Sequence, residues 1–358
     1  MFDRIIGQER PKDILKRAIE NKRVPHAYLF SGPEGVGKEA MAIELAKALY
    51  CEGSEKPCNN CSNCHRIGQF EHPDIHFIFP APKSATVKDE RQILDSLAED
   101  PYARKKPWAA PNISIDKIRQ VRRMSAMKPM EGLRIVIISD ADTMNVQAAN
   151  ALLKILEEPP PNMHLVLVTS RTNALLATII SRCQEVRFSA LSDTQIAGAL
   201  RQRQGLDEQQ AEILSRISQG SYGRALQWMD EAFEQLREDT LQYLRTSLQR
   251  PIQQFDLVRD LLDKHEKKQV RDLLGLLLLW FRDSLVYINS EGQDNTHIVN
   301  LDKLDVLEKF VGTFEYMDVH KIIDHIEESI RLVDRNVQMD LILLVLFNHI
   351  TDNVRFKR

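Results

Sequence analysis

The sequence has few long apolar runs, few cysteines and no excess of charge of one sign. Its longest apolar run, residues 273–281, is about half the length that a helix needs to cross a bilayer, so it predicts a buried core helix. The polar residues Asp3 and Arg4 follow Phe2, which does not resemble a signal peptide. We therefore expect a cytoplasmic protein without a membrane partner.

The formal net charge is only -3 at pH 7. This balance argues against a protein whose whole surface grips nucleic acid, and it predicts that any contact with DNA is local. A chain of 358 residues is too long for one ordinary hydrophobic core. We therefore expect about two or three domains.

Cysteine is scarce, yet four of the five cysteines lie in one short segment: Cys51, Cys58, Cys61 and Cys64. Four thiolates at short spacing are typical of a structural Zn²⁺ site, which leaves no open position for a substrate. A vacant site and oxidised thiols are the alternatives. His65, next to the last cysteine, is an alternative ligand, although a surface histidine is the simpler interpretation.

The chain is organised around residues 31–39, Ser-Gly-Pro-Glu-Gly-Val-Gly-Lys-Glu. This segment follows the apolar run 27–30 and precedes a helical pattern at 40–50. A strand, a glycine loop and a helix in this order predict a phosphate site, because loop N–H groups and the helix N-terminus point at one anion. A chance glycine turn is the alternative. The expected nucleotide-binding residues are Gly32, Pro33, Glu34, Gly35, Val36, Gly37, Lys38 and Glu39.

One position departs from the phosphate-loop pattern. Glu39 stands where a Ser or Thr hydroxyl normally ligates Mg²⁺. A carboxylate is longer and would lie beside negatively charged phosphates, so we expect a loop that keeps its shape and has lost catalysis. Asp140 and Asp142 are candidate Mg²⁺ ligands at the end of a predicted strand, with helix capping as the alternative role.

Strands and helices alternate up to residue 188. Strands are predicted at 27–30, 75–79, 133–139, 165–169 and 185–188, the first four from largely apolar runs, and helical patterns lie between them. This alternation predicts an α/β fold with a five-stranded parallel sheet and helices on both faces. Beyond residue 189 we expect only helices. Residues 80–112 are expected to form a partly ordered insertion around a short helix at 91–97, without a chemical role.

With these motifs assembled, the sequence resembles the delta-prime family of bacterial DNA polymerase III clamp-loader subunits, in the AAA+ superfamily. The resemblance spans essentially the whole chain. The motifs are weak singly and specific together. They are residues 26–30 leading into the phosphate loop, the four-cysteine knuckle, His72-Pro73-Asp74, residues 150–154, residues 157–160, Ser181-Arg182-Cys183 and Gly220-Ser221.

The resemblance implies three domains. They are an AAA+ domain over residues 1–188 with a zinc knuckle at 51–64, a small helical lid over 189–230, and a C-terminal helical collar for oligomerisation over 231–358. It also implies a hetero-pentameric ring with gamma/tau and delta subunits, which uses ATP to load the sliding clamp onto primed DNA in replication.

Arg182 matches the family's arginine finger, which acts in trans at a neighbouring subunit's nucleotide. A planar, permanently charged guanidinium there neutralises charge on the transferring phosphoryl group. The alternative role for Arg182 is a surface salt bridge.

The gamma/tau motor subunit is similar, but the chain departs from it at three places. Glu39 replaces the magnesium hydroxyl, Ser139 falls on the metal-binding Asp, and Gly223 falls on the lid arginine. We therefore expect a largely non-hydrolysing stator with a degenerate ATPase site, catalytic only through Arg182 in trans. Whether ATP still binds there is left open.

Two other functions remain as alternatives. One is a gamma/tau-like ATPase motor, in which Lys38 and Asp140 restore the chemistry. The other is a DNA-binding module that uses the zinc knuckle near Arg66, against which the near-neutral charge counts.

Overall fold

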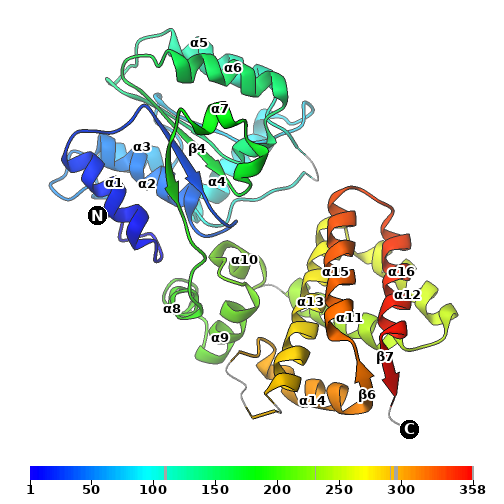
Figure 1. The fold of residues 1–358 in the computed structure, drawn as a ribbon. Helices are drawn as coiled ribbons and strands as arrows, with labels where there is room; N and C mark the ends of the chain where they lie inside the picture. The colour runs from blue at the N-terminus through cyan, green and yellow to red at the C-terminus, as the bar shows by residue number, and fades with distance from the viewer. Residues whose placement is uncertain (109–110, 230, 291, 294–296, 357–358) are drawn as a thin grey trace. The chain divides into compact units, whose positions relative to one another are not determined.

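A computed structural model describes residues 1–108, 111–229, 231–290, 292–293 and 297–356 (Figure 1). The chain divides into two compact units, Met1–Leu206 with Ser218–Gln227, and Asp207–Ile217 with Trp228–Arg358. Residues 109–110 of the expected insertion, and residue 230 at the expected end of the lid, lie outside the described residues.

The first unit is built on a parallel sheet of five strands in the order β2-β3-β4-β1-β5. Its strands coincide closely with the predicted segments, which confirms the α/β fold. They are β1 (Ala27–Ser31), β2 (Ile75–Ile78), β3 (Arg134–Ile138), β4 (Met163–Thr169) and β5 (Gln184–Arg187). β1 and β3 are buried along their whole length, as expected for strands covered on both faces.

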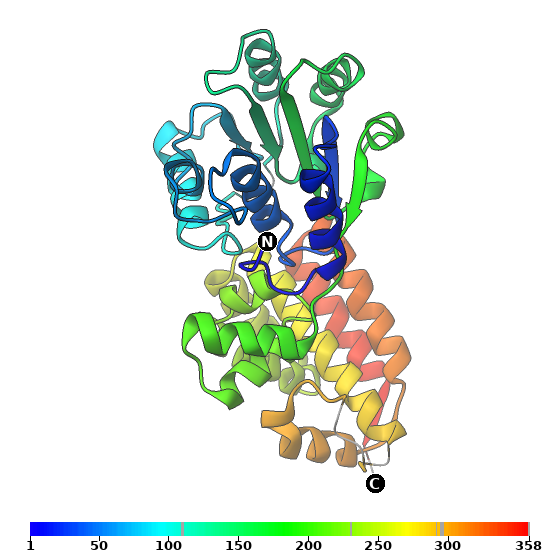
Figure 2. The same ribbon diagram turned by 90° about the vertical axis from the view of Figure 1, so that its left-hand side faces the viewer.

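Helices cover both faces of this sheet (Figures 1 and 2). One face packs on α5 (Ile115–Ser125), α6 (Val146–Glu157) and α7 (Ala177–Ile180) through a continuous apolar core. The other face is covered by α1 (Glu9–Glu20) and α2 (Lys38–Tyr50). Each fully buried aliphatic side chain in such a core contributes about 1.5 to 3 kcal/mol. The remaining elements of this unit are α3 (Ser62–Gly68), α4 (Val87–Glu99), η1 (Ala141–Thr143), η2 (Thr172–Ala174), α8 (Asp193–Gln204) and α10 (Tyr222–Gln227).

α4 is longer than the helix predicted at 91–97, because a capping box fixes its start. The Asp89 backbone N–H donates to Thr86 Oγ1 at 3.2 Å, and the Asp89 carboxylate accepts from the Thr86 N–H at 2.8 Å. Two otherwise unpaired N–H groups are thereby satisfied at the first turn.

The second unit consists mainly of helices, and α13 is central to it. This helix contains the apolar run 273–281, and Leu274, Leu277 and Phe281 are fully buried in it, which confirms the predicted core helix. No helix of the described residues is both long and apolar enough to span a bilayer. The helices are α9 (Glu208–Ile217), α11 (Glu231–Ser247), α12 (Pro251–Lys264), α13 (Lys267–Asn289), η3 (Leu301–Lys303), α14 (Leu304–Thr313), α15 (Val319–Asp334) and α16 (Met339–Asp352).

The expectation of helices alone beyond residue 189 is wrong at one place. β6 (Phe314–Met317) and β7 (Val354–Phe356) pair antiparallel. Each follows the end of a helix, and each is too short to carry a strand pattern of its own. The backbone groups of the two segments satisfy one another across the pair.

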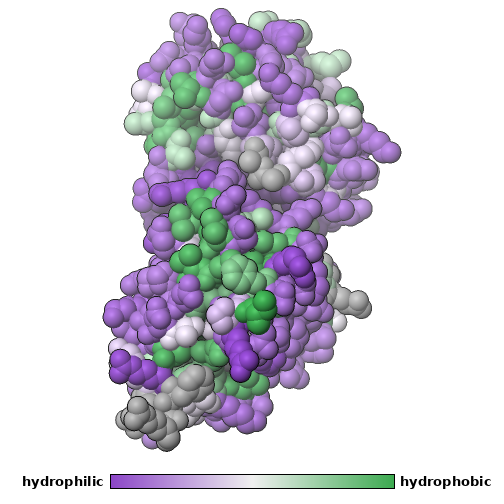
Figure 3. Space-filling model, turned by 90° about the vertical axis from the view of Figure 1, so that its right-hand side faces the viewer, coloured by the Kyte–Doolittle hydropathy of each residue, from purple (hydrophilic) through white to green (hydrophobic). Residues whose placement is uncertain are grey.

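An apolar patch lies on α12 and α16, which pack against each other (Figure 3). Ile252 and Phe255 are 67% and 59% exposed, and Leu341 and Val345 are 52% and 50% exposed. Each pair is about one helical turn apart and therefore lies on one side of its helix.

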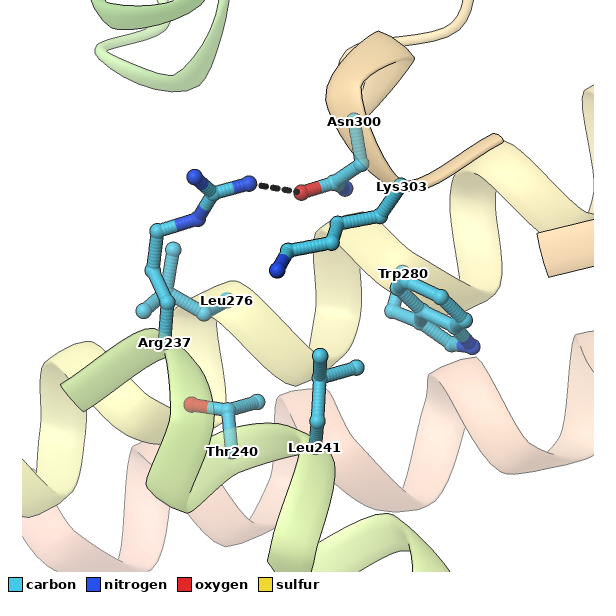
Figure 4. A pocket seen from close by; sticks show the side chains of 7 residues that line it. All are labelled: Arg237, Thr240, Leu241, Leu276, Trp280, Asn300 and Lys303. Atoms are coloured by element: carbon cyan, nitrogen blue, oxygen red, sulfur yellow. Dashed lines mark hydrogen bonds between the residues drawn. The ribbon is translucent and has the colours of Figure 1, made fainter. Parts of the chain in front are cut away.

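A small pocket in the second unit holds about 20 Å³, which is room for about one water molecule (Figure 4). Arg237 donates a hydrogen bond across it to Asn300 Oδ1 at 3.4 Å. The pocket is lined by Arg237, Thr240, Leu241, Leu276, Trp280, Asn300 and Lys303. It is too small for a nucleotide.

Candidate nucleotide and metal sites

The predicted phosphate loop connects β1 to the first residue of α2, with Gly37 immediately before the helix. Gly35 and Gly37 have φ angles of 72° and 99°, a left-handed region that favours glycine. Val36 between them is fully buried and anchors the loop. The loop therefore has the turn and helix junction that the sequence predicts.

Lys38 is folded back onto the loop itself. Its ammonium donates to the carbonyl oxygen of Gly32 at 2.8 Å and to that of Pro33. Burial lowers the pKa of Lys38 to about 8, although nearby Glu39 and Glu34 act to raise it. Loop carbonyl groups thus accept the hydrogen bonds that a phosphate would otherwise accept.

The carboxylates of Glu39 and Asp140 share one cation, the Arg104 guanidinium. Arg104 Nε lies 3.3 Å from Glu39 Oε1, and Arg104 Nη2 donates to Asp140 Oδ2. The Arg104 side chain is only 5% exposed. Ser139 Oγ also donates to Glu39, so Glu39, Ser139 and Asp140 are joined through Arg104 in one network.

Lys106 adds a second positive charge to this network. Its ammonium lies 2.5 Å from Glu34 Oε1 and 3.4 Å from Asp140 Oδ2. Burial acts to raise the pKa of Asp140, but Arg104 and Lys106 outweigh it and lower the pKa to about 2. Asp140 is therefore ionised and neutralised by side chains of its own chain.

Both cations come from the insertion at 80–112, to which the sequence assigned no chemical role. Arg104 and Lys106 belong to no recognisable motif, and no spacing in the sequence links them to Glu39 or Asp140. Only the tertiary fold brings them to the phosphate loop.

Tyr102 from the same insertion lies across the loop. A Cβ atom placed on Gly37 would meet its ring at 2.7 Å. The Tyr102 hydroxyl accepts a hydrogen bond from the Ile6 N–H at 2.9 Å, and its ring packs edge-on against Tyr222 with 5.1 Å between centroids. The Arg203 guanidinium lies 5.7 Å from the centre of the Tyr102 ring.

Gly223, one of the three departures from the motor pattern, also contacts the loop directly. The Gly223 N–H donates to the Gly35 carbonyl oxygen at 2.9 Å. A Cβ atom on Gly223 would lie 2.9 Å from the Tyr102 carbonyl oxygen. Gly223 therefore packs directly against backbone atoms, which leaves no room for a side chain at this position.

Asp142, the second candidate acid, has other partners. Its carboxylate accepts from Thr169 Oγ1 at 2.7 Å and from Arg171 Nε at 2.9 Å. It connects the end of β3 to the end of β4 and does not join the network of Arg104.

Arg182 follows α7 at the surface of the first unit, where its side chain is 36% exposed. It donates to the Thr178 carbonyl oxygen at 3.0 Å, and its Nη2 lies 3.0 Å from Glu157 Oε1. The surface salt bridge considered as an alternative role is therefore present in the single chain.

The four clustered cysteines come together at the end of α2, in the following loop and in α3, with all four sulfur atoms within 4.8 Å of one another. The Cys58 N–H donates to Cys51 Sγ at 3.2 Å and the Cys61 N–H to Cys58 Sγ at 3.3 Å. Backbone N–H groups of Asn60 and Cys61 lower the pKa of Cys58 to about 6.

This arrangement fits a tetrahedral metal. Zn–S bonds of about 2.3 Å place sulfur atoms roughly 3.8 Å apart, and N–H groups that point at sulfur stabilise thiolate. His65 is exposed and lies outside the group of residues that could hold an ion. The four cysteines could therefore hold a metal ion without it.

Comparison with known proteins shows the family of the chain. The family described as "DNA polymerase III, delta subunit" matches residues 7–192. The DNA polymerase III subunit delta' of Bacillus subtilis is 32% identical over 281 residues, which cover 78% of this chain and 77% of that protein. The chain belongs to the delta-prime family of DNA polymerase III subunits. The family predicted from the motifs is thereby confirmed.

Delta-prime and tau subunits are both among the relatives. The Haemophilus influenzae delta-prime subunit is 30% identical over 221 residues, covering 60% of this chain and 58% of that protein. The B. subtilis tau subunit is 28% identical over 352 residues, covering 91% of this chain. The chain spans 56% of that tau subunit's length and about a third of the tau subunit of Escherichia coli.

Proposed function

We propose that this delta-prime family member is a clamp-loader subunit of the DNA polymerase III holoenzyme. It acts in DNA replication as a largely non-hydrolysing stator, and it supplies Arg182 in trans to a neighbouring ATPase subunit. The observation that carries the proposal is the pairing of Glu39 and Asp140 with Arg104.

That pairing opposes hydrolysis at this chain's own loop. Mg²⁺ requires oxygen ligands at about 2.0 to 2.1 Å, and in ATPase sites one or two carboxylates and the ATP phosphates supply them together with water. Here the two carboxylates already contact a buried guanidinium, and breaking a buried ion pair typically costs about 3 to 5 kcal/mol. Any ATP that binds at this loop is therefore not hydrolysed efficiently.

The surroundings of Arg182 support its role in trans. Its partner Glu157 is 49% exposed, so the pair is at the surface. Exposed ion pairs are worth only about 0 to 1 kcal/mol. A neighbour's triphosphate carries more negative charge than one carboxylate and would draw the guanidinium away from Glu157.

The proposed partners are gamma/tau and delta subunits in a hetero-pentameric ring, with the sliding clamp and primed DNA reached through the complex. The proposed domains are residues 1–188, a lid over 189–230 and a collar over 231–358. The apolar patch on α12 and α16 lies within this collar and supports its role in oligomerisation. The four-cysteine cluster is proposed to bind structural Zn²⁺.

A catalytically active gamma/tau-like motor is the second candidate. It is favoured by the similarity to the B. subtilis tau subunit, which extends over 91% of this chain. In that function Lys38 would leave its loop carbonyl groups, and Asp140 would leave Arg104, when ATP and Mg²⁺ bind.

ATP turnover by the isolated chain distinguishes the two candidates. We expect no hydrolysis above that of a Lys38→Ala control, because the loss of transition-state contacts costs a factor of hundreds or more in rate. Sustained turnover that Lys38→Ala abolishes would reject the stator and establish the motor.

A further inference from the structure

Residues 100–106 follow α4 and contact the expected nucleotide pocket at three separate places. Tyr102 reaches Gly37 of the loop, Arg104 lies between the two carboxylates, and Lys106 reaches Glu34. One short stretch of chain therefore contacts Gly37, the carboxylates of Glu39 and Asp140, and Glu34.

The surroundings of Tyr102 have the chemistry of a base-binding slot. Its ring packs against Tyr222 and lies under the Arg203 guanidinium, and its polar edge meets the Ile6 backbone N–H. Proteins hold nucleobases by the same combination of stacking, cation–π contact and a hydrogen bond to the ring edge.

Arg104 has the surroundings of a metal cation. Two carboxylates converge on it, and its side chain is only 5% exposed. Two convergent carboxylates at the end of a phosphate loop are ligands that a hard divalent cation accepts. Lys106 lies against Asp140 and adds a second positive charge there.

The loop beneath this segment is otherwise built for phosphate. Gly35 and Gly37 keep the positive φ angles that let backbone N–H groups face an anion, and Lys38 is at the loop. The carbonyl groups that Lys38 contacts are part of the loop itself, so an incoming phosphate competes only with local hydrogen bonds.

We propose that residues 100–106 are a tethered substitute for a magnesium-bound nucleotide, with the Tyr102 ring in place of the base and the Arg104 guanidinium in place of the metal. Weakening this segment exposes a latent site for a magnesium-bound nucleoside triphosphate. The inference rests on the proposed stator function, and it assigns to residues 100–106 the role of keeping nucleotide out of the stator's own pocket.

The test replaces the cations of the segment and measures binding. In the full chain, Arg104→Ala/Lys106→Ala leaves Glu39 and Asp140 without cationic partners. Mg²⁺ alone should then raise the melting temperature of the double variant by several degrees and leave that of the unaltered chain unchanged. Isothermal titration with ATP and Mg²⁺ should give at least about tenfold tighter binding to the double variant, a change of about 1.4 kcal/mol.

Lys105→Ala is the matched control, because Lys105 is an exposed lysine of the same segment and, within the described part of the chain, no ion pair joins its side chain to Glu34, Glu39 or Asp140. It should bind ATP no better than the unaltered chain. Adding Lys38→Ala to the double variant should remove the gained affinity, which places the nucleotide on the loop.

Arg104→Gln keeps much of the side chain's length and serves if the double variant unfolds. A folded variant that gains neither Mg²⁺ stabilisation nor ATP affinity would overturn the inference and leave the stator function standing. Equal ATP affinity in the unaltered chain and the variants would also overturn it. ATP hydrolysis by the unaltered chain would instead reject the stator function.

Discussion

At the scale of single residues, the pocket depends on charges that the chain itself supplies. The sequence predicted the loop residues 32–39 and the acid Asp140, because phosphate loops and strand ends have recognisable local patterns. It did not predict Tyr102, Arg104 or Lys106 as their partners. A contact between residues that are distant in the chain produces no periodicity or fixed spacing in the sequence.

Lys38 gives a residue-scale prediction with a definite pH dependence. Burial chiefly lowers its pKa from 10.5 to about 8. Below pH 8 both the folded and unfolded states carry the proton, so the folded state bears the whole cost of a buried charge. Between pH 8 and 10.5 the folded state releases the proton first, so stability rises with pH in that window.

Lys38→Met removes this cost, so the variant should gain stability over the unaltered chain at pH 7 and lose most of that advantage by pH 10. The difference between the two pH values should be at most about 2 to 3 kcal/mol. Urea unfolding followed by circular dichroism measures it, with the exposed Lys105→Met as control. An advantage that is the same at both pH values would contradict the assignment of a buried, pKa-lowered ammonium.

At the scale of elements, the sequence pattern predicted the parallel sheet well. It predicted helix α4 and the strand pair β6 and β7 poorly. The inner strands β1, β3 and β4 are apolar runs, and their burial along almost the whole length makes them visible in the sequence. The edge strands β2 and β5 are only partly buried. The length of α4 was underestimated, because its capping box at Thr86 lies in a segment of irregular composition. β6 and β7 were missed because their pairing joins segments distant in the chain.

The cysteine cluster is an element-scale feature with its own test. We expect about one zinc ion per purified chain and its loss in Cys64→Ser, because Cys64 is a buried member of the set. Cys183→Ser is the matched control, since Cys183 lies outside the cluster and should keep the metal.

Loss of zinc should also destabilise the end of α2 and α3, which carry cysteines of the cluster. We expect a melting temperature about 5 °C or more lower for Cys64→Ser, measured beside the metal content. Full metal content in Cys64→Ser, or none in the unaltered chain, would contradict the proposed zinc site.

At the scale of the whole molecule, the proposed stator gives a catalytic group to a neighbouring subunit rather than receiving one. Residues 100–106 contact its own loop, while Arg182 lies at the surface and is held by the Thr178 carbonyl oxygen and the exposed Glu157 carboxylate. A net charge of only -3 is compatible with a subunit that reaches DNA through its partners. The family motifs predicted Arg182 as the finger, and its surface pair with Glu157 could not be predicted from them.

The most direct measurement is ATP hydrolysis by the reconstituted complex that contains Arg182→Ala in this subunit. We predict that the complex assembles normally and that hydrolysis at the neighbouring subunit falls by about a thousandfold or more. Arg182→Lys should restore little, because an ammonium cannot replace the planar guanidinium, and Arg187→Ala, an exposed surface arginine on β5, should leave the rate unchanged. An unchanged rate with Arg182→Ala in a fully assembled complex would contradict the account.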